Sequence, residues 1–241
     1  MDVFEKEFKI DSSHADFKHK LKVSAFTNML IQIATDHADK LNFGFFDLNP
    51  SGLSWVLSRF TIELTDIPNW YDTIKLRTWP KGLNRLFYQR DTIAYLPDGK
   101  EFARVTSDWL IIDVKSRRPK LFDKENPILK VPCNEHALEN VNNTLNFNIE
   151  PSEEKIFRIQ YSDVDLNKHL TATRYIDFMF NMFDLDFFIT NQPKKITVNY
   201  LHEALFNEEV IMKMAVSDMQ YRFELICKSN NKALFRAEVY F

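Results

Sequence analysis

Ser162-Asp163-Val164-Asp165-Leu166-Asn167-Lys168-His169 is the stretch on which the interpretation of this chain depends. Asp165, Asn167 and His169 recur at every second position, directly before a run with apolar residues at helical spacing. In an extended backbone this spacing places all three side chains on one face. A carboxylate, a carboxamide and an imidazole beside a helix N-terminus are suited to activating water and stabilising an oxyanion. The stretch therefore predicts hydrolysis of an acyl compound.

Composition excludes several other classes of protein. The chain has 241 residues, enough for one large or two small cores, and a formal charge of −3, which does not favour a nucleic-acid partner. No apolar run approaches the roughly 20 residues that span a bilayer. With four glycines there is no GxGxxG, P-loop or GxSxG motif. Two cysteines, Cys133 and Cys227, and a start without a secretion signal predict a reducing, cytoplasmic location.

The first half reads as a helix followed by an antiparallel meander. Apolar residues at helical spacing predict a helix over residues 23–41, with Ser24 as a candidate N-cap. Turn signals such as Lys81-Gly82-Leu83-Asn84 separate the strand-like runs that follow. Those runs cover residues 55–64, 73–79, 86–95 and 102–113.

The second half repeats this order. A strand over residues 156–161 precedes a long helix over 171–188, with Thr171 near its expected cap. Four strands then follow, over residues 195–201, 210–216, 221–228 and 233–241. The segment Asp16–Leu21 echoes Asp165–Leu170 but has no central Asn. Residues 115–153, rich in charge and proline, predict a connector lying across the surface.

A strand, a long helix and a four-stranded antiparallel meander, repeated, is the plan of an α+β tandem hot-dog protein, in which each of two antiparallel sheets wraps its own long helix. The chain resembles the acyl-acyl carrier protein thioesterases of plants and bacteria over nearly its whole length. We therefore expect an N-terminal hot-dog domain at 1–114 with an acyl-chain tunnel, a connector at 115–153 and a catalytic hot-dog domain at 154–241. The matching segments are Trp55–Phe60, Pro68–Asp72, Thr78–Pro80 and, most specifically, Ser162–His169.

The resemblance implies a catalytic set of Asp165, Asn167, His169 and Glu203. Plant members carry a Cys directly after this Glu, whereas this chain has Ala204, so a thiol at that position cannot be the nucleophile. His169 or Glu203 is expected to polarise the attacking water, with no covalent intermediate. We expect the acyl chain to lie against the first-half helix and sheet, and the tunnel residues are Met29, Leu30 and Ile33.

The resemblance further implies hydrolysis of acyl-carrier-protein thioesters to free fatty acid, which ends chain elongation. The expected partner is therefore the acyl carrier protein, and no cofactor is expected. The protein could also form a homodimer. The alternatives are hydrolysis of acyl-CoA or another small thioester, and a non-catalytic acyl-binding module. The basic cluster Lys115, Arg117, Arg118 and Lys120 is either a solvated turn or a surface that meets the acidic carrier.

Capping groups, a calcium loop and a metal site are the simpler interpretations of these polar residues. Asp, Asn and His before a helix commonly serve as capping and loop groups. Asp163, Asp165 and Asn167 also mimic the start of a calcium loop, but that loop requires Gly at its sixth position and Glu at its twelfth, where this chain has Lys168 and Arg174. The six histidines form no HExxH motif or Cys/His cluster, so no metal site is predicted.

Overall fold

The computed structural model describes residues 3–121, 135–139, 142–217 and 219–241. The chain divides into two compact units, Met1–Asn142 and Asn143–Phe241. Within the described residues, no helix is both long and apolar enough to cross a membrane. Cys133 lies outside the described residues, and Cys227 is a buried free thiol.

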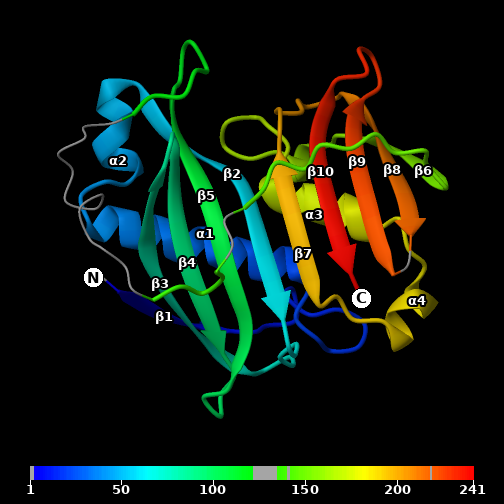
Figure 1. Ribbon diagram of the computed structural model, residues 1–241, viewed down its shortest axis with the longest axis horizontal. Coiled ribbons are helices and arrows are strands. Elements are labelled where there is room, and N and C mark those ends of the chain that lie inside the picture. The colour runs from blue at the N-terminus through cyan, green and yellow to red at the C-terminus, as the bar shows by residue number, and fades with distance from the viewer. Residues whose placement is uncertain (1–2, 122–134, 140–141, 218) are drawn as a thin grey trace. The chain divides into compact units, whose positions relative to one another are not determined.

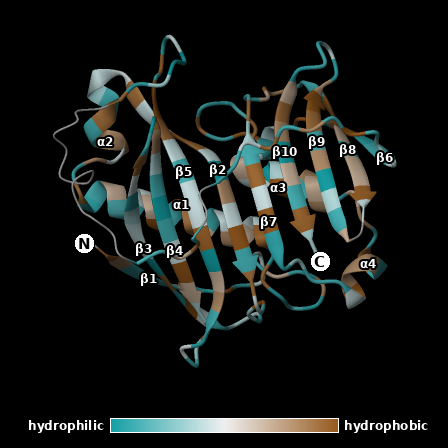
Figure 2. Ribbon diagram, in the orientation of Figure 1, coloured by the Kyte–Doolittle hydropathy of each residue, from teal (hydrophilic) through white to brown (hydrophobic). Residues whose placement is uncertain are grey.

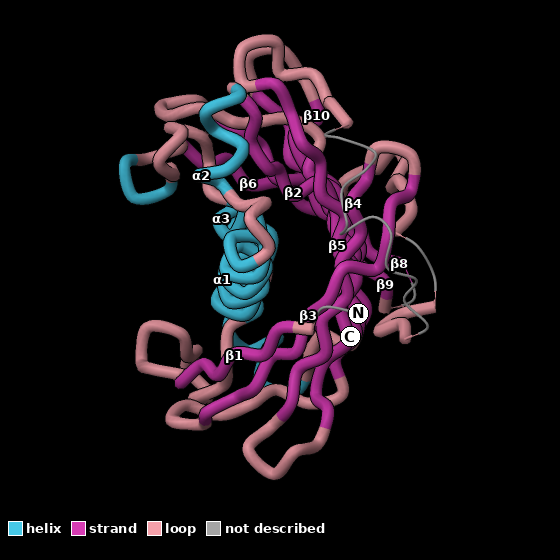
Figure 3. Tube along the Cα trace, turned by 90° about the vertical axis from the view of Figure 1, so that its left-hand side faces the viewer, coloured by secondary structure: helices cyan, strands magenta, loops and turns pink. Residues whose placement is uncertain are grey.

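The first unit is a five-stranded antiparallel sheet with one long helix (Figure 1). Its strands follow the order β1-β3-β4-β5-β2, and each neighbouring pair is antiparallel. The sheet curves around α1, which is seen nearly end-on in Figure 3. The elements are β1 (Phe4–Lys9), α1 (Val23–Lys40), α2 (Phe45–Leu48), the 3-10 helix η1 (Asn49–Ser51), β2 (Leu53–Leu64), β3 (Thr73–Asn84), β4 (Phe87–Tyr95) and β5 (Glu101–Asp113).

Hydrophobic periodicity explains how α1 sits on its sheet. Phe26, Met29, Ile33 and Ala34 recur at helical spacing and are buried, so one stripe of the helix faces the strands. Residues of opposite hydropathy alternate along the strands (Figure 2), as expected for strands with one face on a core. The predicted N-cap is wrong: Lys22 is the N-cap, and Ser24 is a buried residue inside the first turn.

The second unit repeats the same connectivity. Its strand order, β7-β10-β9-β8-β6, matches that of the first unit when β6 is equated with β1 and β7 with β2. The elements are β6 (Glu153–Arg158), the 3-10 helix η3 (Tyr161–Asp163), α3 (Ala172–Phe180), α4 (Leu185–Thr190), β7 (Lys195–Tyr200), β8 (Glu209–Ser217), β9 (Gln220–Cys227) and β10 (Ala233–Tyr240).

The prediction of one continuous helix over 171–188 is wrong, because the chain breaks between α3 and α4. Lys155 from β6 donates to the carbonyls of Asn181 and Met182, at 2.9 and 3.1 Å, and so satisfies acceptors at the end of α3. The turn also lets Phe183 pack against Phe187, at 4.3 Å between ring centroids. Phe183 further contacts Tyr221, Phe223 and Phe241, so the break buries an aromatic ring that a straight helix would direct elsewhere.

The predicted turn at 81–84 is also wrong. Strand β3 continues to Asn84, and its register shifts between Pro80 and Gly82, where a bulge takes up the glycine at φ 143°. The reversal falls instead on Arg85 and Leu86, where Arg85 has φ 57°. Two-residue hairpins require such positive φ values, which are usually supplied by Gly or Asn.

The outer face of the first sheet carries a buried polar network. Asp91 on β4 is fully buried and lies 3.2 Å from Lys81 Nζ. The same carboxylate accepts hydrogen bonds from the Thr106 hydroxyl and from the backbone N–H of Ala137, at 2.5 and 2.8 Å. Lys81 also donates to the carbonyl of Leu138. These bonds attach Ala137 and Leu138 of the connector to the sheet.

Candidate active site

The motif loop folds as a tight turn between η3 and α3, so the predicted extended backbone is wrong. Asp165 Oδ1 accepts the backbone N–H groups of Asn167 and His169, at 2.8 and 3.1 Å. Lys168 takes a left-handed conformation with φ 65°, which closes the turn. Asp and Asn favour such local bonds over an extended strand. The Asp165 carboxylate therefore shapes the loop that presents His169.

The loop is held against α3 by a second carboxylate. Asp163 is buried and accepts the N–H of Gln160 at 2.8 Å. Its other oxygen lies 2.8 Å from both Nε and Nη2 of Arg174, in the first turn of α3. Thr171 is the N-cap of α3, as predicted, although its side chain makes no capping hydrogen bond. The helix start is thus fixed by an ion pair rather than by a capping hydroxyl.

Glu203 approaches His169 from a different part of the chain. It lies in the loop after β7 rather than on a strand. The carboxylate Oε2 is 3.4 Å from His169 Nε2, and both side chains keep access to solvent. A backbone bond from Leu170 N–H to the carbonyl of Ala204, at 2.8 Å, fixes the two loops side by side. An imidazole and a carboxylate at this distance can share a proton and polarise water.

Tyr175, on α3, positions the segment that carries Glu203. Its hydroxyl donates to the carbonyl of His202 at 3.3 Å and accepts the N–H of Ala204 at 3.2 Å, so it bonds the residues on both sides of Glu203. Burial raises the pKa of Tyr175 well above its ordinary value, which keeps the phenol protonated. The ring packs against Tyr200 and Phe235.

The first unit contains the same loop without the reactive groups. Asp16 Oδ1 accepts the N–H groups of Lys18 and Lys20, at 2.8 and 2.9 Å, as Asp165 does for Asn167 and His169. His19 has φ 60°, like Lys168 at φ 65°. The backbone of Lys20 forms an isolated antiparallel β-bridge with Asn69, and that of His169 forms the same bridge with Leu205. A lysine therefore occupies the structural position of His169.

Comparison of the two loops distinguishes residues that shape the loop from residues that could react. The backbone bonds Leu21 N–H to Pro68 O and Leu170 N–H to Ala204 O are equivalent, which places Ile67 where the second unit has Glu203. The aspartate is common to both loops, whereas the imidazole at the position of His169 and the glutamate at the position of Glu203 occur only in the second. The loop geometry is therefore a property of the fold, and the reactive pair is specific to the second unit.

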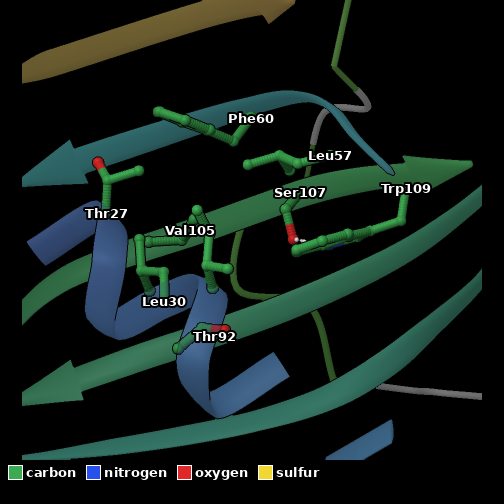
Figure 4. A pocket seen from close by; sticks show the side chains of 9 residues that line it. Thr27, Leu30, Leu57, Phe60, Thr92, Val105, Ser107 and Trp109 are labelled. Carbon is green, nitrogen blue, oxygen red and sulfur yellow. Dashed lines mark hydrogen bonds between the residues drawn. The ribbon is translucent and has the colours of Figure 1, made fainter. Parts of the chain in front are cut away.

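A narrow pocket lies between α1 and the sheet of the first unit (Figure 4). The predicted tunnel residue Leu30 lines it, whereas Met29 and Ile33 are buried in the core and do not. Three hydroxyl side chains, Thr27, Thr92 and Ser107, belong to the wall, and Ser107 accepts the Trp109 indole N–H at 3.0 Å. The full lining is Thr27, Leu30, Ile31, Leu57, Phe60, Thr92, Val105, Ser107 and Trp109.

The structure brings together three of the four predicted catalytic residues. Asp165, His169 and Glu203 meet at the two joined loops. Asn167 sits at the exposed turn, where its carboxamide makes no hydrogen bond to any described residue. Sequence reasoning missed Tyr175, because its helical spacing marked it only as a core residue. Within the described ranges, no His, Cys, Asp and Glu cluster could hold a metal ion.

A curved antiparallel sheet around a helix, built twice with the same connectivity, defines a tandem hot-dog protein. Two family models match the chain: the acyl-ACP thioesterase N-terminal domain over residues 1–126, and the C-terminal domain of the same family over residues 147–241. Because these matches cover most of the chain, it belongs to the acyl-ACP thioesterase family.

Solved structures and curated relatives agree with this assignment. A crystal structure of an acyl-ACP thioesterase from Bacteroides thetaiotaomicron has 27% identity and a TM-score of 0.89, and covers 99% of this chain and 97% of its own. The 12:0-ACP thioesterase from Umbellularia californica shares the fold, with 18% identity and a TM-score of 0.87, covering 99% and 96%. Oleoyl-acyl carrier protein thioesterase 2 of Arabidopsis thaliana, named chloroplastic, is 24% identical over 89% of this chain. This chain spans 63% of that relative's length.

Removing the Tyr175 hydroxyl is expected to lower kcat while leaving the fold intact. The Tyr175→Phe variant keeps the ring packing but releases both backbone groups that flank Glu203. Small misplacements of a catalytic group cost up to about 10²-fold in rate, so we expect a loss of about 10-fold in kcat with KM little changed. Steady-state kinetics and thermal unfolding check this. Tyr240→Phe, on the exposed end of β10, is the control, and equal kcat in Tyr175→Phe and wild type would contradict the positioning role.

Proposed function

We propose that this chain hydrolyses acyl-carrier-protein thioesters, releasing free fatty acid and carrier protein and thereby terminating fatty acid elongation. The observation that supports this most is the His169–Glu203 pair, which occurs in only one of two otherwise equivalent loops. Family membership supports a thioester as the bond that is broken. Carrier preference and a cytoplasmic location are parts of the same proposal.

In the proposed mechanism, His169 or Glu203 accepts a proton from a water molecule as its oxygen attacks the thioester carbonyl carbon. The carbon–sulfur bond then breaks, and the proton returns to the leaving thiolate. Asn167, exposed at the turn, positions the substrate carbonyl or the base, and N–H groups at the start of α3 stabilise the oxyanion. General base catalysis contributes about 10²–10⁴-fold, and one oxyanion donor about 10²–10³-fold. These factors suffice without an acyl-enzyme.

A substrate panel tests the proposal directly. Purified protein is assayed with the same acyl chains attached to acyl carrier protein, to coenzyme A and to pantetheine. A higher kcat/KM for the carrier-bound series supports the proposed function. Equal values for coenzyme A thioesters would favour a general acyl-CoA hydrolase, and acyl binding without turnover would indicate a non-catalytic module. Size-exclusion chromatography with light scattering tests whether the protein is a homodimer.

The basic turn after β5 is a candidate carrier-docking surface. Lys115 and Arg118 are exposed and make no ion pair within the described residues, whereas Lys120 is engaged by Asp113 at 2.9 Å. Complementary charge chiefly accelerates association. We expect a Lys115→Glu, Arg118→Glu double variant to raise KM for carrier-bound substrate by about 10-fold, with kcat and the coenzyme A reaction unchanged.

Salt provides the matching control for this surface. Raised ionic strength screens exposed charges, so KM for the carrier-bound substrate should rise in the wild type and much less in the double variant. Lys100→Glu, on the far turn before β5, should behave as wild type. An unchanged KM in the Lys115→Glu, Arg118→Glu variant would place the docking surface elsewhere.

A further inference from the structure

Arg90 lies on the inner face of β4, next to two residues that line the pocket. Thr92 is two residues along the same strand, so both side chains leave on one face. Ser107 is the direct partner of Arg90 in β5, and such cross-strand pairs have Cβ atoms about 4.5–5.5 Å apart. Thr92 and Ser107 both belong to the pocket wall (Figure 4). Arg90 is not itself a lining residue, but it is the immediate neighbour of Thr92 and Ser107 in the pocket wall.

The guanidinium contacts an imidazole and a hydroxyl. Arg90 Nη1 lies 2.9 Å from His37 Nδ1 and donates to Thr78 Oγ1 at 3.2 Å. Thr78 Oγ1 also accepts the Thr92 hydroxyl at 2.9 Å, so the polar network reaches the pocket lining. No carboxylate in the described parts of the chain forms an ion pair with Arg90.

The Arg90 side chain is deeply placed but not fully enclosed. Burial lowers the pKa of Arg90 to about 10, which leaves it charged at neutral pH. Yet part of its surface remains accessible, unlike that of the neighbouring His37 and Thr78, which are fully buried. A charged group that has lost most of its solvent and has no counter-ion is costly to dehydrate further.

A hydrocarbon chain in the pocket gains affinity only while it meets apolar surface. Each methylene buried against apolar side chains is worth about fourfold. That gain in affinity ends where a longer acyl chain would have to displace the remaining solvent from the Arg90 guanidinium. We propose that Arg90 ends the acyl-chain pocket and so determines the longest acyl chain that this protein accepts. This inference rests on the proposed function, since it takes the pocket of the first unit as the acyl site.

Chain-length profiles of Arg90 variants test the proposal. Arg90→Met replaces the cation with an unbranched apolar side chain, and kcat/KM is measured for thioesters of increasing even chain length. Two further methylenes should then be accommodated, so the ratio of kcat/KM for the chain two carbons beyond the wild-type optimum to that for the optimum should rise by about 10-fold. Arg90→Lys keeps the charge and should keep the wild-type profile. A folded Arg90→Met variant with an unchanged profile would overturn the proposal.

A binding experiment separates this inference from the proposed activity. Free fatty acids of graded length are titrated into wild type and Arg90→Met by calorimetry, which requires no turnover. Absence of thioester hydrolysis in the wild type would refute the proposed function, while a shift toward longer fatty acids would still support the role of Arg90. Should Arg90→Met not fold, Arg90→Gln removes the charge but keeps donors for Thr78 and His37. Identical fatty-acid series for Arg90→Gln and wild type would refute the inference, and Arg85→Met, on the exposed hairpin, is the control.

Discussion

Replacing His169 with alanine is expected to lower kcat by about 10²-fold or more in a chain that still folds, because the base or its partner is lost. Glu203→Gln should have an effect of similar size, since Glu203 Oε2 lies 3.4 Å from His169 Nε2. Groups that act as a unit are strongly non-additive. The double variant should therefore be no slower than the slower of the two single variants by more than a few-fold.

The controls for this prediction come from the first unit. His19→Ala alters the equivalent loop, which has no reactive pair, and should leave kcat unchanged. Circular dichroism and thermal unfolding establish that each variant is folded. A folded His169→Ala variant with near wild-type kcat would show that the proposed site is wrong.

Asp165 and Asn167 should behave differently from each other. Asp165→Ala removes the acceptor for two backbone N–H groups, so both kcat and thermal stability should fall together. The Asn167 side chain makes no hydrogen bond within the described residues, so Asn167→Ala should lower kcat with no loss of stability. The contrast distinguishes a residue that shapes the loop from one that faces substrate.

Much of the fold could be predicted because, in both halves, the hydrophobic period of the helices differs clearly from that of the strands. The helix over residues 23–41 was predicted to within one residue, and the strand-like runs correspond to observed strands. The predictions failed where tertiary contacts outweigh local pattern. Periodicity alone continues through Phe183, whereas the aromatic cluster and the Lys155 ammonium end α3 at Phe180. Likewise Gly82 marks a bulge, because the longer pairing of β3 with β4 moves the turn to Arg85.

The site was harder to predict than the fold. The His169–Glu203 pair came from the family resemblance, since no spacing rule links residues 34 positions apart. The alternation of Asp165, Asn167 and His169 suggested an extended strand, but the Asp165 side chain instead bonds the backbone of its own loop. One signal in the sequence indicated this structural role of Asp165. The similar segment Asp16–Leu21 keeps the aspartate but has Lys20 at the position of His169. A residue retained in both halves is better explained by shared loop geometry than by catalysis.

Removing the Asp91 carboxylate is expected to cause a large loss of stability in the first unit. The side chains of Asp91 and Lys81 are 0% and 7% exposed, and their charged atoms are 3.2 Å apart. Asp91 also accepts bonds from Thr106 and Ala137, which joins β4, β5 and the connector. Breaking a buried pair leaves an uncompensated charge, which costs about 3–5 kcal/mol. Asp91→Ala should lower the free energy of unfolding by that amount.

Tryptophan fluorescence during urea unfolding measures this effect selectively, because all four tryptophans of the chain (Trp55, Trp70, Trp79 and Trp109) lie in the first unit. Asp98→Ala removes an exposed carboxylate paired with Lys100 and should leave the transition unchanged. A Lys81→Met, Asp91→Leu double variant should be more stable than Asp91→Ala alone, because it leaves no buried charge without a partner. If Asp91→Ala unfolds at the wild-type urea concentration, or if the double variant loses the sum of both single effects, then the pair does not act as a coupled buried unit.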